Sequence, residues 1–258
     1  MPTTADVRNH QVYLAPGVSR RYRQRTLTLV EALALLRYHD AFAGRDVLDL
    51  GVGTGRSSIY LAPLARRYEA IDYSPEMVAA MHAAMPVLSV RLGDTRDLTD
   101  FPDASFDFVF GPNNVIDAVG SEGRQRILAE VARVLRYGGI FMFSSHNRGS
   151  ADALAAPRLE WSRNPVTLLK HLIEWARQLA NHRRMKPLCE VHEDYALLDD
   201  YGHDFTLLHF YARQNYERKQ LEAYGFETIE VLDRAGHAVV DDDDASGSPD
   251  LMYMARRI

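Results

Sequence analysis

The 258-residue chain carries 30 Lys and Arg against 35 Asp and Glu, so its formal net charge is −5 and its pI is near 6.1. Hydrophobic residues make up 47% of the chain and charged residues 25%, which excludes a disordered or fibrous protein. The acidic balance argues against a nucleic-acid partner, because phosphates demand a basic binding face.

Signals for export and for membrane insertion are missing from the sequence. The single cysteine, Cys189, cannot form an internal disulfide, and residues 1–17 lack the charged and apolar regions of a secretion signal. No apolar run approaches the roughly 20 residues that a membrane span needs. We therefore expect a cytoplasmic protein without a membrane span, whose oligomeric state the sequence leaves open.

Strands and helices alternate through the first half of the chain. Residues 20–39 have helical apolar spacing and predict an N-terminal helical segment over 1–45. A core over 46–146 follows, in which alternation predicts a doubly wound, mostly parallel α/β sheet covered on both faces. Strands are expected at 46–50, 68–71, 87–92, 106–110 and 140–145, with helices after the first strand to about residue 66, at 75–85 and at 124–135.

The alternation lapses after the fifth strand, where we expect a helical insertion or lid over 147–204. Its apolar stripe consists of Leu169, Leu172, Ile173, Ala176, Leu179 and Ala180. The basic residues on and after its polar side either attract an acidic substrate or surface or form a solvated helix face. They are Lys170, Arg177, Arg183, Arg184 and Lys186.

Residues 205–258 are expected to complete the core sheet. Residues 205–211 predict a short extra strand or lid edge, 215–224 a helix, and 227–232 and 251–255 two strands. The acidic loop at 241–248 is interpreted as a solvated turn, because the ligand spacing and distal glutamate of a calcium loop are absent. No metal site is predicted.

The first candidate site is a glycine-rich turn directly after a buried strand. Gly51, Gly53 and Gly55 let the backbone approach a ligand closely and aim the next helix N-terminus at it. Dinucleotide-binding enzymes use a related turn with a different third spacing, G-x-G-x-x-G. The carboxylate of Asp49, two residues before Gly51, would repel a pyrophosphate but favour a cationic ligand. This reasoning favours S-adenosylmethionine, which has an ammonium and a sulfonium group, over a nicotinamide dinucleotide.

Two more carboxylates follow the next strands. Asp72 ends the second strand, where it can accept hydrogen bonds from ribose hydroxyls, and Asp94 and Thr95 follow the third strand, where Asp94 can accept from the adenine amino group. The alternatives are a helix cap for Asp72 and a turn aspartate for Asp94. Because carboxyl ends of parallel strands meet at one edge, we expect the three carboxylates to converge there.

These residues together resemble the class I S-adenosylmethionine-dependent methyltransferase family. The resemblance covers roughly residues 47–147. It implies a Rossmann-like methyltransferase fold with a seven-stranded sheet whose final strand is antiparallel. The matching motifs are Val47-Leu48-Asp49-Leu50-Gly51-Val52-Gly53-Thr54-Gly55-Arg56, Ala70-Ile71-Asp72-Tyr73-Ser74-Pro75-Glu76-Met77, Gly93-Asp94, Phe106-Asp107-Phe108-Val109 and Leu135-Arg136-Tyr137-Gly138-Gly139.

The resemblance also implies roles for individual residues. Gly51 and Gly53 would hold the methionine part, Tyr73 and Met77 the adenine faces, and Gly111 to Asn113 would border the sulfonium. A member of an N-terminal cluster would meet the methionine carboxylate, or the cluster forms an exposed charged helix face. That cluster is Arg20, Arg21, Tyr22, Arg23 and Arg25.

Methyl transfer from a sulfonium needs alignment in a dry cleft, and a general base only when the acceptor must lose a proton. His146, after the fifth strand, and His209, in the segment 205–211, are the candidate bases, and each is alternatively a structural histidine. Asn113 and Asn114 are candidates for orienting the acceptor. Their sequence Gly-Pro-Asn-Asn departs from the Asn/Asp-Pro-Pro-Tyr/Phe motif of enzymes that methylate bases of nucleic acids.

The predicted function is therefore O- or N-methylation of a small molecule. The insertion, with Trp161, Trp175 and nearby Tyr195, is a candidate cover for the acceptor, although aromatic residues at such spacing also form core. The alternatives are a noncatalytic S-adenosylmethionine-binding protein and a nicotinamide-dependent oxidoreductase.

Overall fold

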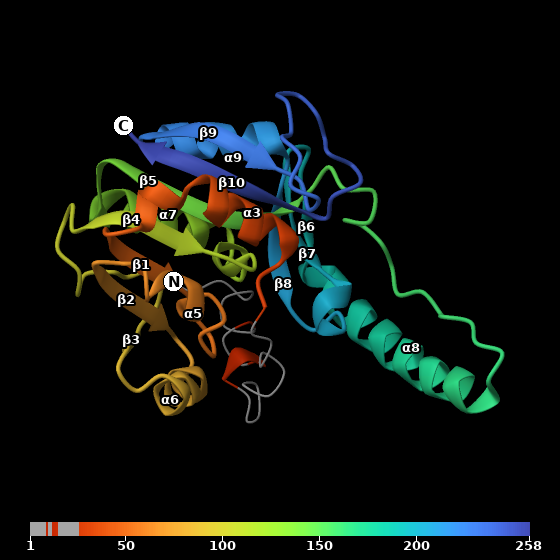
Figure 1. Cartoon of the computed structure of the whole chain (residues 1–258). Helices are drawn as coiled ribbons and strands as arrows, with labels where there is room; N and C mark the ends of the chain where they lie inside the picture. The colour runs from red at the N-terminus through yellow and green to blue at the C-terminus, as the bar shows by residue number, and fades with distance from the viewer. Residues whose placement is uncertain (1–8, 10–11, 15–25) are drawn as a thin grey trace.

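The computed structural model describes residues 9, 12–14 and 26–258, which form a mixed sheet of ten strands with helices on both faces (Figure 1). The first half contains α3 Leu29–Arg37, α4 His39–Phe42, β1 Asp46–Leu50, α5 Ser58–Leu61, β2 Arg67–Asp72, α6 Pro75–Ala84, β3 Ser89–Leu92, β4 Phe106–Gly111, the 3-10 helix η1 Val115–Asp117 and α7 Ser121–Val134. The second half contains β5 Leu135–Asn147, α8 Pro165–Met185, η2 Lys186–Leu188, β6 Glu190–Val191, β7 Tyr195–Asp199, η3 Tyr201–His203, β8 Leu208–Ala212, α9 Gln214–Ala223, β9 Phe226–Leu232 and β10 Asp250–Arg257.

The two faces of the sheet bury separate apolar clusters. On one face, Leu48, Val109 and Phe141 pack with residues of α7 and α9. On the other, Val47 and Met142 pack with residues of α3, α4, α5 and α6. Because neighbouring residues of a strand point to opposite faces, buried strands covered on both sides are apolar at nearly every position. The predicted doubly wound α/β class is confirmed.

The strand count is ten, so the predicted number of seven is wrong. Seven strands run in the order β3-β2-β1-β4-β5-β10-β9, and β10 is antiparallel to both of its neighbours. The remaining three, β6, β7 and β8, form an antiparallel meander joined to β5. The segment between α8 and β8 thus contains a hairpin that helical periodicity did not reveal.

Strand β5 has two partners in succession along one edge. It pairs with β4 from Leu135 to Phe143, and with β8 at His146 and Asn147. Its other edge pairs with β10 from Ile140 to His146, so β8 continues on the first edge where β4 stops. This register brings β8 beside the carboxyl end of β4, at the edge where ligands bind in open α/β sheets.

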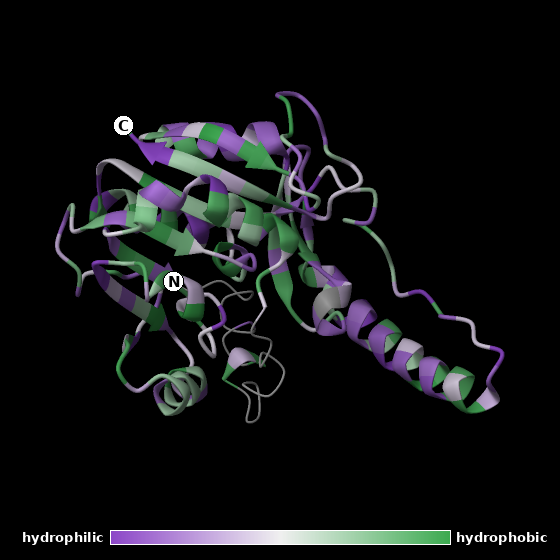
Figure 2. Cartoon of the chain, viewed as in Figure 1, coloured by the Kyte–Doolittle hydropathy of each residue, from purple (hydrophilic) through white to green (hydrophobic). Residues whose placement is uncertain are grey.

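Helix α8 extends away from the sheet, and residues 153–164 run alongside it to its tip (Figure 1). Polar and apolar residues alternate along its surface (Figure 2). None of the helices in the described part of the chain combines the length and apolarity that a bilayer crossing requires.

The helix predicted to run to about residue 66 is much shorter. Only Ser58–Leu61 is α-helical, because the turn occupies the preceding residues and Pro63 interrupts the ladder of hydrogen bonds. The turn needs glycine: Gly51 has φ of +58°, and a Cβ there would overlap Val115 Cγ2 of η1.

Gly51→Ala should lower the free energy of unfolding by about 2–5 kcal/mol, because left-handed strain adds to the overlap with Val115. Gly44 has φ of +69° with open space around it, so Gly44→Ala should cost only about 1–2 kcal/mol. Urea denaturation of both variants measures the difference. Equal losses would contradict the packing role of Gly51.

Candidate functional site

Asp72 joins the glycine turn to the start of α6. Its Oδ2 accepts a hydrogen bond from Gly53 N at 2.8 Å, and its Oδ1 accepts one from Ser74 N at 2.8 Å. Burial raises the pKa of Asp72, and the two backbone bonds act against that rise. Ser74 is the N-cap of α6 and the helix has no side-chain cap, so Asp72 bonds the residue at the helix start without capping the helix. Each carboxylate oxygen has a further lone pair, so Asp72 keeps capacity to accept hydrogen bonds.

A first pocket lies over this turn. Asp72, Tyr73 and Met77 line it from the end of β2 and from α6, and Val115 and Val119 add apolar wall. A Cβ at Gly53 would meet no atom within 4 Å, so this glycine faces open space. The other lining residues are Tyr13, Gly51, Ser74, Asp94, Thr95, Arg96, Pro112, Asn113 and Ala118.

Asp94 lines the first pocket together with a cation that the sequence analysis did not select. Arg96 Nη2 donates to Asp94 Oδ2 at 2.6 Å, Arg96 Nε lies 3.0 Å from both oxygens, and Arg96 N donates to Oδ1 at 2.9 Å. These contacts occupy the acceptor capacity of the carboxylate. The adenine contact of Asp94 stays a prediction, and it requires Arg96 to release an oxygen.

Asp49 is fully buried and does not line either pocket. Its Oδ2 accepts from Ser57 Oγ at 2.6 Å and from Tyr68 OH at 2.7 Å, while Oδ1 has no partner among the described residues. Burial raises the pKa of Asp49 to about 6, against the hydrogen bonds from Ser57 and Tyr68. The carboxylate of Asp49, which was expected in the pocket wall, therefore lies beneath the glycine turn.

Two other predicted cofactor residues are placed differently, and a third lies outside the described residues. Gly55 and Gly111 are absent from the walls of both pockets. A Cβ at Gly55 would overlap Met85 Cε, and one at Gly111 would lie 3.4 Å from Phe143 Cβ, so both glycines serve packing. Tyr22, with the arginines around it, lies outside the described residues.

A second, larger pocket of about 1070 Å³ adjoins the first. The two share Tyr13, Gly51, Gly53, Pro112 and Asn113 as lining residues. Asn114 lines the second pocket, and its side-chain oxygen is buried without a hydrogen-bond partner in the described part of the chain. The two pockets are therefore continuous, and the second begins where a ligand in the first pocket would end.

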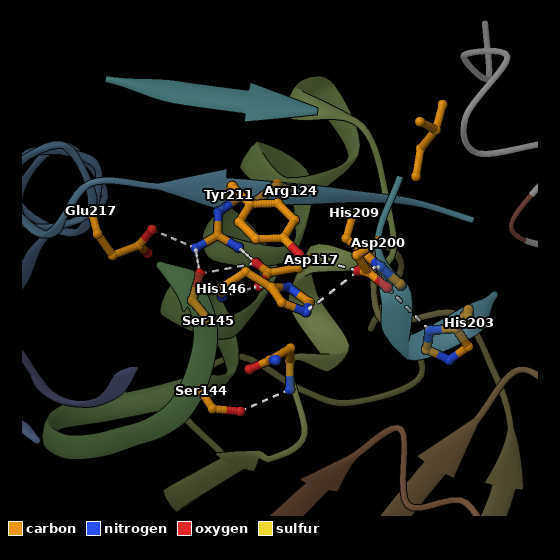
Figure 3. Close-up of polar contacts among 12 residues, drawn as sticks. Asp117, Arg124, Ser144, Ser145, His146, Asp200, His203, His209, Tyr211 and Glu217 are labelled. Atoms are coloured by element: carbon orange, nitrogen blue, oxygen red, sulfur yellow. Dashed lines mark hydrogen bonds and ion pairs between the residues drawn. The ribbon is translucent and has the colours of Figure 1, made fainter. Parts of the chain in front are cut away.

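His146 and His209 both line the second pocket. Figure 3 shows these side chains with their polar partners. His146 Nδ1 lies 2.9 Å from Asp117 Oδ2, and the backbone N of His146 donates to the same oxygen at 2.7 Å. Asp117 also accepts hydrogen bonds from Arg124 and Ser145. A carboxylate with these donors keeps the proton of His146 on Nδ1, which leaves Nε2 as an acceptor.

Asp200 lies between three histidines at the wall of this pocket (Figure 3). Its Oδ2 is 2.5 Å from His209 Nδ1, 3.2 Å from Tyr211 OH and 3.9 Å from His146 Nε2, and its Oδ1 is 3.9 Å from His203 Nδ1.

The charges of this cluster stabilise one another. Burial acts to raise the pKa of Asp200, but His209 and His203 outweigh it and hold that pKa well below its ordinary value. Burial acts to lower the pKa of His209, but Asp200 outweighs it and raises that pKa. His209 thus keeps a proton on the ring nitrogen that faces Asp200.

Ligand atoms of His146, Asp200 and His209 lie within 4.8 Å of one another, a spacing that could accommodate a metal ion. The sequence analysis predicted no metal. His209 Nδ1 lies 2.5 Å from Asp200 Oδ2, and His146 Nδ1 lies 2.9 Å from Asp117 Oδ2, so each ring has a carboxylate partner at Nδ1. This arrangement suits proton transfer through the histidines.

Asp117 and Asp200 were missed by the sequence analysis. Asp117 follows the 112–114 segment in a single 3-10 turn, and Asp200 follows the unpredicted strand β7. Neither position has a periodic or glycine-based signal. Pro112 and the two asparagines that follow it were the local hint of a turn there.

The fold and the pocket over the glycine turn define an α/β protein that binds a nucleoside-bearing cofactor. A family model described as a methyltransferase domain matches residues 47–139. A phosphatidylethanolamine N-methyltransferase of Cereibacter sphaeroides is 33% identical over 204 residues, which are 76% of this chain and 89% of that protein. The chain belongs to the S-adenosylmethionine-dependent methyltransferases of class I, and S-adenosylmethionine is the cofactor of this family.

Other known proteins match only part of this chain, or match its fold at low sequence identity. A probable S-adenosylmethionine-dependent methyltransferase of Mycolicibacterium smegmatis is 39% identical over 106 residues, covering 41% of this chain and 40% of that protein. The chain thus spans well under half the length of this relative. A crystal structure of an S-adenosylmethionine-dependent methyltransferase from Clostridium acetobutylicum has a TM-score of 0.61 at 13% identity, covering 96% of this chain and 97% of that one. This likeness confirms the fold.

The raised pKa of Asp49 predicts that the stability of the protein depends on pH. A carboxyl with a folded pKa near 6 and an unfolded value near 3.8 contributes stability at low pH that is lost as pH rises through 6. Asp49→Asn cannot ionise. Its free energy of unfolding, relative to the original protein, should therefore rise by about 3 kcal/mol between about pH 3 and pH 7. Denaturation at a series of pH values measures this, and a constant difference would refute the buried carboxyl.

Proposed function

We propose that the protein transfers the methyl group of S-adenosylmethionine to a hydroxyl or amine of a small molecule bound in the second pocket. The observation that carries this proposal is the continuity of the two pockets through Gly51, Gly53 and Asn113, with His146 in the wall of the second. The relative from Cereibacter sphaeroides is an N-methyltransferase, which supports an amine as one acceptor class. The single cysteine supports a cytoplasmic location.

The residues of the first pocket fit the cofactor. Gly53 faces open space, Asp72 retains lone pairs for ribose hydroxyls, and Met77 and Val119 give apolar surface for adenine. When bound, S-adenosylmethionine supplies an activated methyl group. The chain then has to align the acceptor and exclude water, because the electrophile needs no further activation.

Within the second pocket, His146 is the proposed general base. Its Nε2 accepts the acceptor proton while Asp117, held by Arg124, stabilises the positive ring that forms. Asp200, 3.9 Å from Nε2, receives hydrogen bonds from His209 and Tyr211 and keeps this wall negative. His209 is therefore proposed as a positioning residue, and Asn114 as a donor or acceptor to the incoming molecule.

The two alternative functions, a nicotinamide-dependent oxidoreductase and a noncatalytic binding protein, require different features of the site. A nicotinamide-dependent oxidoreductase does not match the family to which the chain belongs. A noncatalytic binding protein needs no second pocket with an oriented histidine. Both the second pocket and the contact between His146 and Asp117 favour an enzyme.

Asp72→Ala should weaken the binding of S-adenosylhomocysteine by about 1–3 kcal/mol, because the ribose loses a charged acceptor and the turn loses its bond to Gly53. The affinity of Asp72→Asn, which keeps one oxygen, should lie between the affinities of the original protein and of Asp72→Ala. Isothermal titration calorimetry measures the affinities. Asp103→Ala removes an exposed carboxylate and serves as control. Unchanged affinity in a folded Asp72→Ala protein would reject the ribose contact.

His146→Ala should reduce turnover by about 10²- to 10⁴-fold, the usual contribution of a general base, and leave S-adenosylhomocysteine affinity unchanged. Release of S-adenosylhomocysteine across a panel of hydroxyl- and amine-bearing metabolites identifies the acceptor and measures turnover. The control is His237→Ala, because His237 is exposed and lines neither pocket. Loss of activity in a chelator would indicate a metal at His146 and Asp200, and full activity of His146→Ala would exclude the base.

A further inference from the structure

Helix α8 presents an apolar stripe to solvent on the part of the molecule that extends farthest from the sheet (Figure 1). Val166 is 64% exposed, Leu169 59% and Ile173 63%. At the helical angle of 100° per residue these three side chains and Ala176 lie on one face. Single exposed apolar residues are ordinary on a protein surface, but a continuous stripe of them indicates a contact.

The opposite face of α8 is already covered. His171 Nδ1 lies 2.9 Å from Glu160 O, and Trp175 Nε1 donates to Pro157 O at 3.3 Å, so residues 153–164 pack along this side. Gln178, Asn181 and Met185 are buried where the helix meets the rest of the protein. The stripe is therefore the side of α8 that these segments leave uncovered.

The segment that carries the stripe is basic, in contrast to the acidic chain as a whole. Residues 154–186 contain seven Lys or Arg and two Asp or Glu, whereas the chain has a net charge of −5. Lys170 and Arg177 lie along one edge of the stripe, and Arg177 is paired with Asp204. An apolar stripe bordered by Lys and Arg is typical of a helix that lies in the interface of an anionic membrane. The basic residues are Arg158, Arg163, Lys170, Arg177, Arg183, Arg184 and Lys186.

The basic charge of this segment favours an anionic membrane over a second copy of the chain as the partner of the stripe. Two α8 helices packed through their stripes would bring two basic segments together, and like charges in contact oppose association. The tip also carries Trp161, which is 82% exposed, and Trp is enriched at membrane–water interfaces. A projecting rod suits a flat lipid surface, since its exposed N-terminal part can lie along that surface.

We propose that α8 and the tip at Trp161 bind the surface of a bilayer containing anionic phospholipid. Val166, Leu169 and Ile173 enter the boundary between headgroups and acyl chains, and the basic residues contact lipid phosphates. The helix lies on the membrane and does not cross it. Glu174, Arg177 and Gln178 of α8 also line the second pocket, so the bound helix sets that pocket beside the lipid.

Co-sedimentation with vesicles tests the proposal without any methyl transfer. The full chain should bind vesicles of mixed phosphatidylcholine and phosphatidylglycerol at least about tenfold more tightly than vesicles of phosphatidylcholine alone, and high salt should weaken that binding. Leu169→Glu/Ile173→Glu should reduce the affinity at least about tenfold, because carboxylates replace the stripe.

Leu36→Glu/Val87→Glu is the matched control, since it adds the same charges at two exposed apolar positions outside α8. Circular dichroism and S-adenosylhomocysteine binding check that both variants remain folded. Equal vesicle binding by the two variants would overturn the proposal, as would no binding of the original chain. If the original chain ignores vesicles and light scattering shows a dimer that Leu169→Glu/Ile173→Glu dissociates, a second copy occupies the stripe instead.

Discussion

The guanidinium of Arg124 is the interaction on which the acceptor side of this protein depends. It is fully buried, forms ion pairs with Asp117 of η1 and Glu217 of α9, and lies 4.9 Å from the ring centre of Phe210 in β8. Removing one partner of a buried pair is costly, about 3–5 kcal/mol, because the remaining charge is left without compensation. One side chain therefore connects three elements that are distant in the sequence.

This cluster links stability to chemistry. Asp117 receives Arg124 on one oxygen and His146 on the other, so the charge that holds η1 in place also orients the proposed base. Val115, in the same 3-10 turn, packs against Gly51 of the cofactor turn. Burial of the cluster excludes water from the shell behind His146 and strengthens these electrostatic contacts.

The structure also changes the physical account of cofactor selection. The sequence suggested a crevice lined by three carboxylates, but Asp49 is buried with a pKa near 6 and Asp94 is paired with Arg96. Asp72 and Asp94 both line the pocket, but Asp72 is bonded by backbone N–H groups alone, whereas Asp94 is also paired with the Arg96 guanidinium. The pocket thus offers an open glycine at 53 and hydrogen-bond capacity at the end of β2, with less negative charge than the sequence suggested.

The sequence by itself determined the α/β class and the cofactor turn, because those signals are local. Strands such as β1 are apolar at successive positions, and the glycines at 51 and 53 report backbone conformations that other residues rarely adopt. The register of β5 with β8, the hairpin of β6 and β7, and the meeting of Asp117, His146 and Asp200 were decided only by the tertiary structure. Such contacts depend on which strand continues the edge of β5, and no local periodicity or propensity encodes that choice.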